Sequence, residues 1–344
     1  MAGAAAAGSH AGDDLSLPFA VEALDVRGRV VRLGPALDAV LARHNYPPAV
    51  SRVVGEAMAL TVLLGSALKL EGRFQLQTRS SGPVNMIVVD FDAPDRVRAC
   101  ARFDAEAVTA AAAAGETATG ALLGNGHLAM TIDQGSHASR YQGIVPLEGQ
   151  SLEECAHTYF QQSEQIPTLV RLAVGEEMTS QSPNGRYYRA GGLMVQFMPH
   201  SADRLRQADL SPGDAPTGHQ IAAGVEDEAW NEARLLAETT EAHELLDPLL
   251  PSEQLLYRLY HERGVRVFPA QPVREACQCS RARIMGMLGG FSRQERADMV
   301  GDDGRIGVTC EFCSRHYDLD PGQVEAEIAA AALADSDEGG ERDA

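Results

Sequence analysis

The first 17 residues contain no lysine or arginine. A secretory signal peptide places positive charge ahead of its apolar core, so this segment does not have the pattern of a signal. Its Ala/Gly-rich composition predicts a disordered extension over residues 1–14. With nothing else indicating export, we expect a cytoplasmic protein.

The sequence also lacks a long hydrophobic run. The most apolar stretch, residues 57–68, holds 12 uncharged residues between Glu56 and Lys69. A membrane-spanning helix needs about 20 apolar residues. We therefore expect a soluble protein with no membrane partner, in which this stretch belongs to a buried helix.

Positive charge is scarce along the whole chain. There are 29 lysines and arginines against 48 aspartates and glutamates, for a net charge of −19 and a pI near 4.9. Nucleic-acid-binding proteins normally carry a basic surface, so this balance argues against a nucleic-acid partner. Excess negative charge also favours solubility.

No recognisable active site interrupts the first two thirds of the sequence. No glycine-rich phosphate loop follows a predicted strand, and Gly124-Asn125-Gly126 is short enough to be a simple turn. Four histidines lack the helical pair spacing of metal ligands and are expected at the surface or in the core: His44, His127, His137 and His157. We therefore do not expect an enzyme.

Cysteines are few but unevenly distributed. Four of the six fall in two tight pairs, Cys277 with Cys279 and Cys310 with Cys313. The other two, Cys100 in a predicted strand and Cys155 on a predicted helix face, are expected to be small buried hydrophobic residues.

The paired cysteines predict one zinc ion per chain. Structural zinc sites are closed sets of four nitrogen or sulfur ligands, and close pairs allow one turn to direct two thiolates at one ion. The 30 residues between Cys279 and Cys310 exceed the roughly 12–20 of a minimal zinc finger or ribbon. A small subdomain folded around the metal is expected.

Three features favour a redox role for this site over a plain structural one. A disulfide between cysteines one residue apart closes a small, strained ring, and strained disulfides tend to be labile and regulatory. Zinc binding is coupled to folding, so loss of the metal should unfold the subdomain. Cationic neighbours lower thiol pKa values, and five flank the pairs: Arg274, Arg281, Arg283, Arg315 and His316.

Other interpretations of the cysteines stay open at this point. The site could be a structural zinc ribbon, with the arginines only balancing the charge of four thiolates. A structural disulfide framework fits a reducing cytosol poorly, and chance pairing of four cysteines out of six is improbable.

Hydrophobic periodicity predicts one α/β domain over residues 15–198. Residues 18–33 have the pattern of a β-hairpin turning at Arg27-Gly28. Two helices follow, beginning at Pro35 and after Pro47-Pro48. Later strands are expected at 74–78, 84–91, 97–103, 128–132, 141–145, 169–174 and 187–198, joined mostly by short turns, so the sheet should be mainly antiparallel.

Two further local patterns lie in this domain. Residues 105–120 are alanine-rich and predicted to be helical or loose. Ser151-Leu152-Glu153-Glu154 matches a capping box, and Leu152, Cys155 and Tyr159 follow on one helix face. Turns are expected around Gly135 and at Pro183-Asn184-Gly185.

A linker with two helices is expected over residues 199–272. Residues 199–221 are rich in Pro, Gly, Ser and Asp, and helices are predicted at 227–246 and 252–263. Their apolar faces need a partner to be stable, which could be the first domain or the zinc subdomain. The zinc domain is assigned to 273–330, with a final helix at 323–334, and residues 331–344 form an acidic tail that is predicted to be disordered from Asp335.

Together these motifs resemble the bacterial 33 kDa heat-shock chaperonin family. Both cysteine pairs and Tyr317 match its redox-switch domain, and the likeness extends from about residue 15 to about 330. Upstream matches are His44-Asn45-Tyr46-Pro47, Gly55-Glu56, Tyr141-Gln142-Gly143-Ile144-Val145, Tyr159-Phe160, Ser163-Glu164-Gln165 and Pro167-Thr168.

The resemblance implies an α+β fold with a helical linker, a small zinc domain and the function of a redox-regulated holdase without ATPase activity. Such a protein is inactive when reduced and zinc-bound. Under oxidative stress the disulfides Cys277–Cys279 and Cys310–Cys313 would form, zinc would leave, the C-terminal domain and linker would destabilise, and unfolding client proteins would bind. The active form would be a homodimer. Pairing within each motif agrees with its closeness in sequence.

Two other functional classes remain as alternatives. A zinc-ribbon binding module would use purely structural zinc, and the acidic charge argues against its nucleic-acid version. A thiol oxidoreductase usually carries its Cys-x-x-Cys at a helix N-terminus in a βαβ context, whereas Cys310 follows a strand-like segment at 306–309.

Overall fold

The computed structural model describes residues 12–68, 72–133, 140–178, 186–198 and 227–339, with side chains described as far as residue 330. The chain forms two compact units, Met1–Ala276 and Cys277–Ala344. Four predicted features lie wholly or largely outside the described residues: the N-terminal extension, the turns around Gly135 and at Pro183-Asn184-Gly185, and the segment 199–221.

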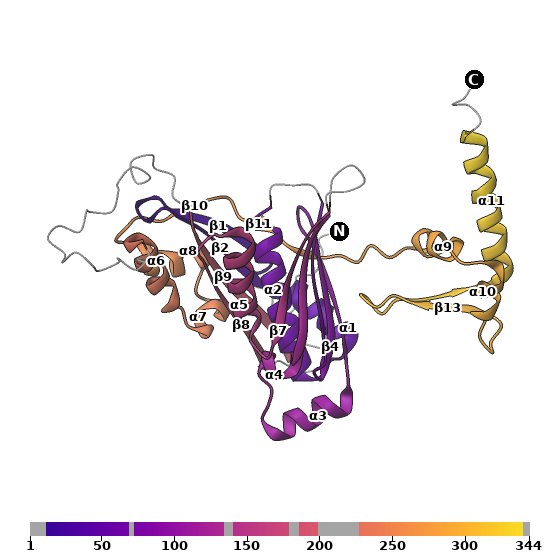
Figure 1. Cartoon of the computed structure of the whole chain (residues 1–344), viewed down its shortest axis with the longest axis horizontal. Coiled ribbons are helices and arrows are strands. Elements are labelled where there is room, and N and C mark those ends of the chain that lie inside the picture. The colour runs from indigo at the N-terminus through magenta and orange to yellow at the C-terminus, as the bar shows by residue number, and fades with distance from the viewer. Residues whose placement is uncertain (1–11, 69–71, 134–139, 179–185, 199–226, 340–344) are drawn as a thin grey trace, which may run out of the picture. The chain divides into compact units, whose positions relative to one another are not determined.

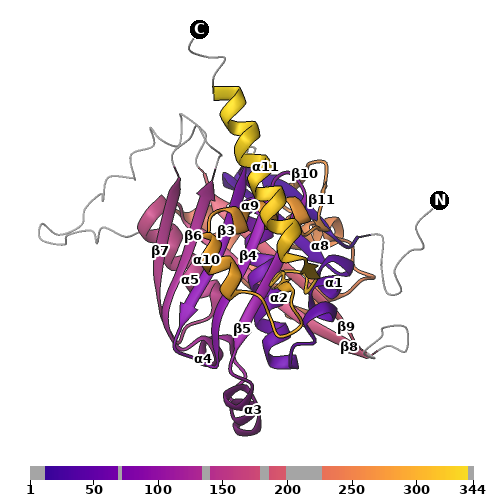
Figure 2. The same ribbon diagram turned by 90° about the vertical axis from the view of Figure 1, so that its right-hand side faces the viewer.

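Unit 1 contains two β-sheets, and every strand pairing within them is antiparallel except that of β12 with β5. The first sheet consists, in order, of β10 (Arg266–Val267), β1 (Leu15–Val21), β2 (Val26–Leu33), β9 (Arg186–Phe197) and β8 (Thr168–Met178), with β11 (Gln271–Pro272) also paired to β1. The second consists of β12 (Arg274–Glu275), β5 (Arg96–Phe103), β4 (Val84–Asp92), β3 (Arg73–Ser80), β6 (Asn125–Asp133) and β7 (Tyr141–Glu148). The order from β5 to β7 is visible in Figure 2. The predicted strands and their mainly antiparallel pairing are confirmed, but they form two sheets where one was expected, because strand periodicity does not show which strands pair.

Helix α2 (Pro48–Gly65) is the centre of unit 1 (Figure 1). It contacts strands of both sheets, and one apolar cluster joins its side chains to those of the two sheets. It is buried on nearly all sides and mostly apolar, with Arg52 exposed, as expected for a core helix. Helix α1 (Pro35–His44) precedes it, so both helices begin at the predicted prolines.

The length of α2 corrects one step of the sequence argument. The helix begins nine residues before the apolar stretch 57–68, and its 18 residues are long and apolar enough to cross a membrane. However, 83% of that window is buried inside unit 1. Its apolar character is therefore explained by its place in the core.

Three helices cover the opposite face of the first sheet: α6 (Glu228–Glu238), α7 (Ala242–Leu246) and α8 (Ser252–Tyr260). Trp230, Leu256 and Tyr260 pack with Phe19 and Leu193 of the sheet in a second apolar cluster. Unit 1 thus supplies the partner that the amphipathic helices require. The single helix predicted over 227–246 is instead divided, because residues 239–241 leave the helical path between α6 and α7.

A buried arginine also holds α7 to the sheet. Arg32 of β2 donates hydrogen bonds to the carbonyl oxygens of Asp247, at 2.5 Å, and Glu244, at 2.9 Å. These carbonyls lie at the C-terminal end of α7, where backbone acceptors lack partners within the helix. The contact between linker and sheet is therefore polar as well as apolar.

The first hairpin turns at a different place from the predicted one. A 3₁₀ turn, Glu22–Leu24, and Asp25 in the left-handed conformation connect β1 to β2. Gly28 instead lies within β2, opposite Phe19. A Cβ atom there would lie 2.3 Å from both the Met194 carbonyl oxygen and the Phe19 ring, so close packing explains this glycine.

The remaining helices of unit 1 agree with the sequence patterns. Helices α3 (Ala105–Ala114) and α4 (Thr119–Leu123) occupy the alanine-rich region. Helix α5 (Leu152–Tyr159) begins with the predicted capping box, Ser151 with Glu154, and buries its predicted face. A π-helical turn, Phe160–Glu164, extends it.

Unit 2 is built from a hairpin and three helices: β13 (Ile306–Thr309), β14 (His316–Leu319), α9 (Arg281–Gly289), α10 (Arg293–Asp298) and α11 (Pro321–Gly339). Helix α11 begins two residues earlier than predicted and continues past Asp335, where disorder was expected. The described buried core of unit 2 consists of Ile284, Met285, Leu288, Ile306, Leu319 and Val324.

Candidate metal centre

The four paired cysteines come together in unit 2. Their sulfur atoms all lie within 4.8 Å of one another. Two close contacts join one pair to the other: Cys277 Sγ lies 3.6 Å from Cys310 Sγ, and Cys279 Sγ lies 3.3 Å from Cys313 Sγ. The fold thus closes the 30-residue gap between the pairs into one cluster.

Local structure places each pair. Cys279 directly precedes Ser280, whose side chain caps α9 by accepting a hydrogen bond from the Arg283 amide. The second pair lies in the loop between β13 and β14. There the Cys310 amide donates to the Arg315 carbonyl at 3.0 Å, and Ser314 adopts a left-handed conformation that turns the chain back.

The donor set and its spacing fit zinc. Tetrahedral coordination with Zn–S distances of about 2.3 Å requires sulfur atoms about 3.8 Å apart. The observed separations are close to this value without rearrangement of the backbone. Four soft thiolate donors and no carboxylate also favour zinc over magnesium or calcium. The cluster could therefore hold a metal ion as a closed four-sulfur site.

The thiols of the cluster differ in acidity. Although burial raises the pKa of Cys279, hydrogen bonds from Tyr317 and the neighbouring thiols outweigh it and lower this pKa to about 7. Burial raises the pKa of Cys277, and it raises that of Cys313 to about 12. Metal ligation requires thiolates, so binding a divalent cation would release protons from this cluster.

Tyr317 is a neighbour of the cysteine cluster that the spacing of the cysteines alone does not identify. Its hydroxyl donates a hydrogen bond to Cys279 Sγ at 3.3 Å. Tyr317 stands on β14, paired with Val308 of β13. Only the hairpin brings this residue, 38 positions along the chain, to the sulfur.

The cationic residues near the cysteines do not act alike. The charge of Arg315 reaches Cys279 and Cys313, and its side chain also contacts Tyr317. By contrast, Arg274 pairs with Asp95 and Arg281 pairs with Glu327. His316 contacts the Thr309 hydroxyl and Asp318. Fewer of these cations therefore interact with the thiols than their closeness in sequence suggests.

The remaining cysteines and the described histidines have structural surroundings. Cys100 and Cys155 are buried, as predicted, and burial raises the pKa of Cys155 to about 12. His157 accepts a hydrogen bond from the Val170 amide, and His44 stacks on Tyr46. His127 is exposed, and His137 lies outside the described residues.

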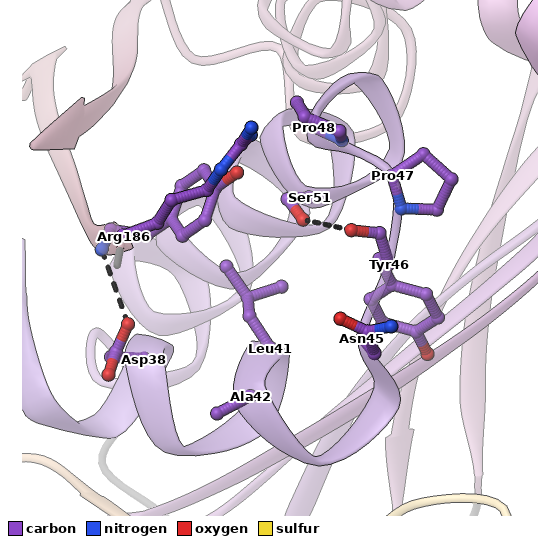
Figure 3. A pocket seen from close by; sticks show the side chains of 10 residues that line it. Asp38, Leu41, Ala42, Asn45, Tyr46, Pro47, Pro48, Ser51 and Arg186 are labelled. Carbon is purple, nitrogen blue, oxygen red and sulfur yellow. Dashed lines mark hydrogen bonds between the residues drawn. The ribbon is translucent and has the colours of Figure 1, made fainter. Parts of the chain in front are cut away.

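An open pocket of about 470 Å³ lies beside the turn between α1 and α2 (Figure 3). Asp38 accepts a hydrogen bond from the Tyr188 amide, and the Ser51 hydroxyl donates to the Tyr46 carbonyl. The Tyr46 hydroxyl accepts from the Ala101 amide at 2.9 Å. These contacts connect the turn to β5, so His44-Asn45-Tyr46-Pro47 has a clear packing role.

The fold and site define a class: an α+β protein with a covering layer of linker helices and a small unit built around four cysteine sulfurs. The Hsp33 protein family model matches residues 14–320. The chain therefore belongs to the Hsp33 family.

Individual relatives agree with this assignment. A 33 kDa chaperonin of Caulobacter vibrioides (strain NA1000 / CB15N) is 46% identical over 311 residues, covering 90% of this chain and 95% of that protein. Another 33 kDa chaperonin, from Ectopseudomonas mendocina, is 35% identical over 93% of this chain and 96% of its own length.

A crystal structure has the same fold. The 33 kDa chaperonin (heat shock protein 33 homolog) of Thermotoga maritima superposes with a TM-score of 0.71 at 19% identity, covering 93% of this chain and 99% of that one. Membership in the family supports a chaperone role, which implies unfolded proteins as partners.

Proposed function

We propose that this protein is a redox-regulated holdase that binds unfolding proteins under oxidative stress without using ATP. The observation that carries the proposal is the gathering of four cysteine sulfurs within 4.8 Å in a unit whose described side chains, up to residue 330, include only six in the buried core. A core this small is typical of domains that depend on a metal or on disulfides.

In the reduced state, Cys277, Cys279, Cys310 and Cys313 hold one zinc ion. The ion supplies a closed structural centre whose binding free energy is also folding free energy for the surrounding unit. The β13–β14 hairpin and the start of α9 are then held together through their cysteines.

Oxidation by peroxide converts each pair to a disulfide. One thiolate attacks a peroxide oxygen, forming a sulfenic acid and releasing hydroxide. The second thiolate then attacks the sulfenic sulfur, forming the S–S bond and releasing a second hydroxide. Each disulfide thus delivers two electrons to one peroxide. We assign the bonds as Cys277–Cys279 and Cys310–Cys313, which removes all four ligands.

Loss of unit 2 structure would weaken the linker. The chain reaches Cys277 through three strands of two residues each, β10, β11 and β12, which follow α8. Strands this short contribute few hydrogen bonds, so they release easily once the segment beyond them unfolds. Displacement of α6–α8 would uncover the apolar face of the first sheet, including Phe19 and Leu193, to which a client could bind.

The remaining features follow the same proposal. The protein acts in the cytoplasm, has unfolding proteins as clients and is a homodimer when active. It has no catalytic turnover and binds neither nucleic acid nor membranes. The ranges 15–198, 199–272 and 273–330 are proposed as the limits of the core domain, the linker and the zinc domain, the last beginning four residues before unit 2 does.

The test combines zinc release with light scattering from an aggregating client. Reduced protein is compared with protein treated with peroxide at mildly elevated temperature. We expect about one zinc per chain to be released and only the oxidised form to suppress aggregation. Cys100→Ala, which leaves the cluster intact, should behave like the wild type.

A contrary result has a definite meaning. If zinc stays bound after oxidation, or if both forms suppress aggregation equally, the cysteines act as a purely structural zinc ribbon. The same conclusion follows if replacing Cys310 and Cys313 by serine leaves the redox response unchanged.

A further inference from the structure

Helix α11 lies beyond Asp320, the last residue matched by the family model. Asp320 forms its N-cap, because its side chain accepts a hydrogen bond from the Gln323 amide at 2.9 Å. Pro321 then occupies the first helical position, which suits its fixed backbone angle. The helix therefore has a well-defined start, directly after the hairpin that carries two of the cysteines.

The first turns of α11 complete the core of unit 2. Val324 is fully buried and is one of the six core residues, while Ile328 packs against the same cluster. Their neighbours Ile284 and Leu288 belong to α9. In a core of six residues, each member contributes a large share of the buried apolar area.

A buried arginine links α11 to the end of α9. The Arg296 guanidinium donates two hydrogen bonds to the Glu325 carboxylate, at 2.6 and 2.9 Å. Its third nitrogen donates to the carbonyl oxygens of Leu288 and Phe291, at and just after the C-terminal end of α9. The Arg296 side chain is only 8% exposed. Such paired, charge-assisted hydrogen bonds are directional and strong.

A second ion pair links α11 to the beginning of α9. Arg281, the first residue of α9, lies 2.5 Å from Glu327. Arg281 is two positions after Cys279, and the intervening Ser280 is the helix cap. Helix α11 therefore holds both ends of the helix whose start positions the first cysteine pair. This pair is about half exposed, so it should contribute less than the Arg296 pair.

We propose that α11 is a brake on the thiol switch. By holding α9 at both ends, Glu325, Glu327 and Val324 keep the first cysteine pair in the metal-binding arrangement. They thereby set how readily the cluster opens to a chelator or an oxidant. The inference rests on the proposed function and adds to it a regulatory element whose strength can be measured in the reduced protein alone.

The test uses full-length, zinc-loaded, reduced protein. Zinc transfer to a colorimetric chelator gives the opening rate, and thiol alkylation followed by mass spectrometry gives an independent second rate. We expect Glu325→Gln to raise both rates about tenfold, through loss of charge-assisted hydrogen bonds to a nearly buried arginine. Glu327→Gln should raise them about twofold.

A matched control is available in the same unit. Asp302 is an exposed acidic residue whose side chain makes no hydrogen bond or ion pair within the described part of the chain. Asp302→Asn changes the net charge by the same amount and should leave both rates unchanged. Val324→Ala, which removes core contacts but no charge, should accelerate opening as well.

The outcomes separate this proposal from the proposed function. Equal opening rates for the wild type, Glu325→Gln and Asp302→Asn would overturn the brake, whatever the aggregation assay shows. Faster opening in Glu325→Gln supports the brake, even if oxidised wild-type protein fails to protect a client. In that case only the proposed chaperone function would be refuted. A Glu325→Gln protein that cannot retain zinc at all also supports the brake, provided that Glu327→Gln shows the smaller change.

Discussion

Unit 1 and unit 2 are stabilised in different ways. Unit 1 buries two large apolar clusters, one around α2 between the sheets and one beneath the linker helices. Among its described side chains, unit 2 has six buried core residues and a cluster of four thiols. Hydrophobic burial supports the first unit without help, whereas a unit with so small a core depends on cross-links. The contrast predicts that unit 2 responds to metal removal or thiol oxidation more strongly than unit 1.

The strongest test of this contrast is metal removal. In zinc-loaded protein, a chelator should unfold unit 2 and leave unit 1 folded, because structural zinc binding supplies folding free energy. Hydrogen exchange should show lost amide protection in α9 and β13–β14, with protection retained in α2 and the central strands. Loss of protection in both units together would show that they fold as one and would refute the contrast.

Within unit 1, a buried carboxyl group provides a pH-dependent test. Burial raises the pKa of Glu56 to about 7, although a hydrogen bond from the Thr119 hydroxyl opposes the shift. Because the folded pKa exceeds the unfolded value, the resulting stability is fully present below about pH 4.5 and is lost as the pH rises through about 7.

The variant Glu56→Gln should remove this pH dependence while keeping the hydrogen bond from Thr119. Its free energy of unfolding, measured with denaturant, should exceed that of the wild type by about 2–3 kcal/mol at pH 8 and by little at pH 4. Glu154→Gln is the opposite-sign control, because hydrogen bonds within its capping box lower the pKa of Glu154. Glu154→Gln should lower the free energy of unfolding only slightly, and only at the higher pH. An unchanged pH profile in Glu56→Gln would show that another group carries the effect.

The smallest expected effect concerns Tyr317, which contacts one of the four clustered cysteines. Tyr317→Phe removes the hydrogen bond to Cys279 Sγ and should weaken zinc affinity about tenfold, as is typical for partners of metal ligands. Competition with a chelator of known affinity measures this change. Tyr257→Phe, an exposed tyrosine in unit 1, is the control. Equal affinities would mean that the hydroxyl does not orient the ligand.

Much of the local structure was predictable from the sequence. Prolines at 35 and 48 begin α1 and α2, and the capping box at Ser151 begins α5, because these signals act over three or four residues. Each cysteine pair is a local signal of the same kind, whereas the meeting of the two pairs across 30 residues depends on the fold of unit 2. The misplaced first turn shows the limit: Arg27-Gly28 has the composition of a turn, but Gly28 is required by packing against Phe19 and Met194.

The sequence by itself determined most of the helices and strands of unit 1, the amphipathic faces and the placement of four cysteines in two tight pairs. Only the tertiary structure decided that the strands form two sheets around α2, that unit 1 covers the linker helices, that Tyr317 contacts Cys279 and that α11 packs against α9. The physical reason is range. Caps, turns and periodicity depend on neighbouring residues, whereas the contacts of Tyr317 and of Arg296 with Glu325 join residues about 30 or more positions apart, whose closeness depends on the burial and pairing of the whole unit.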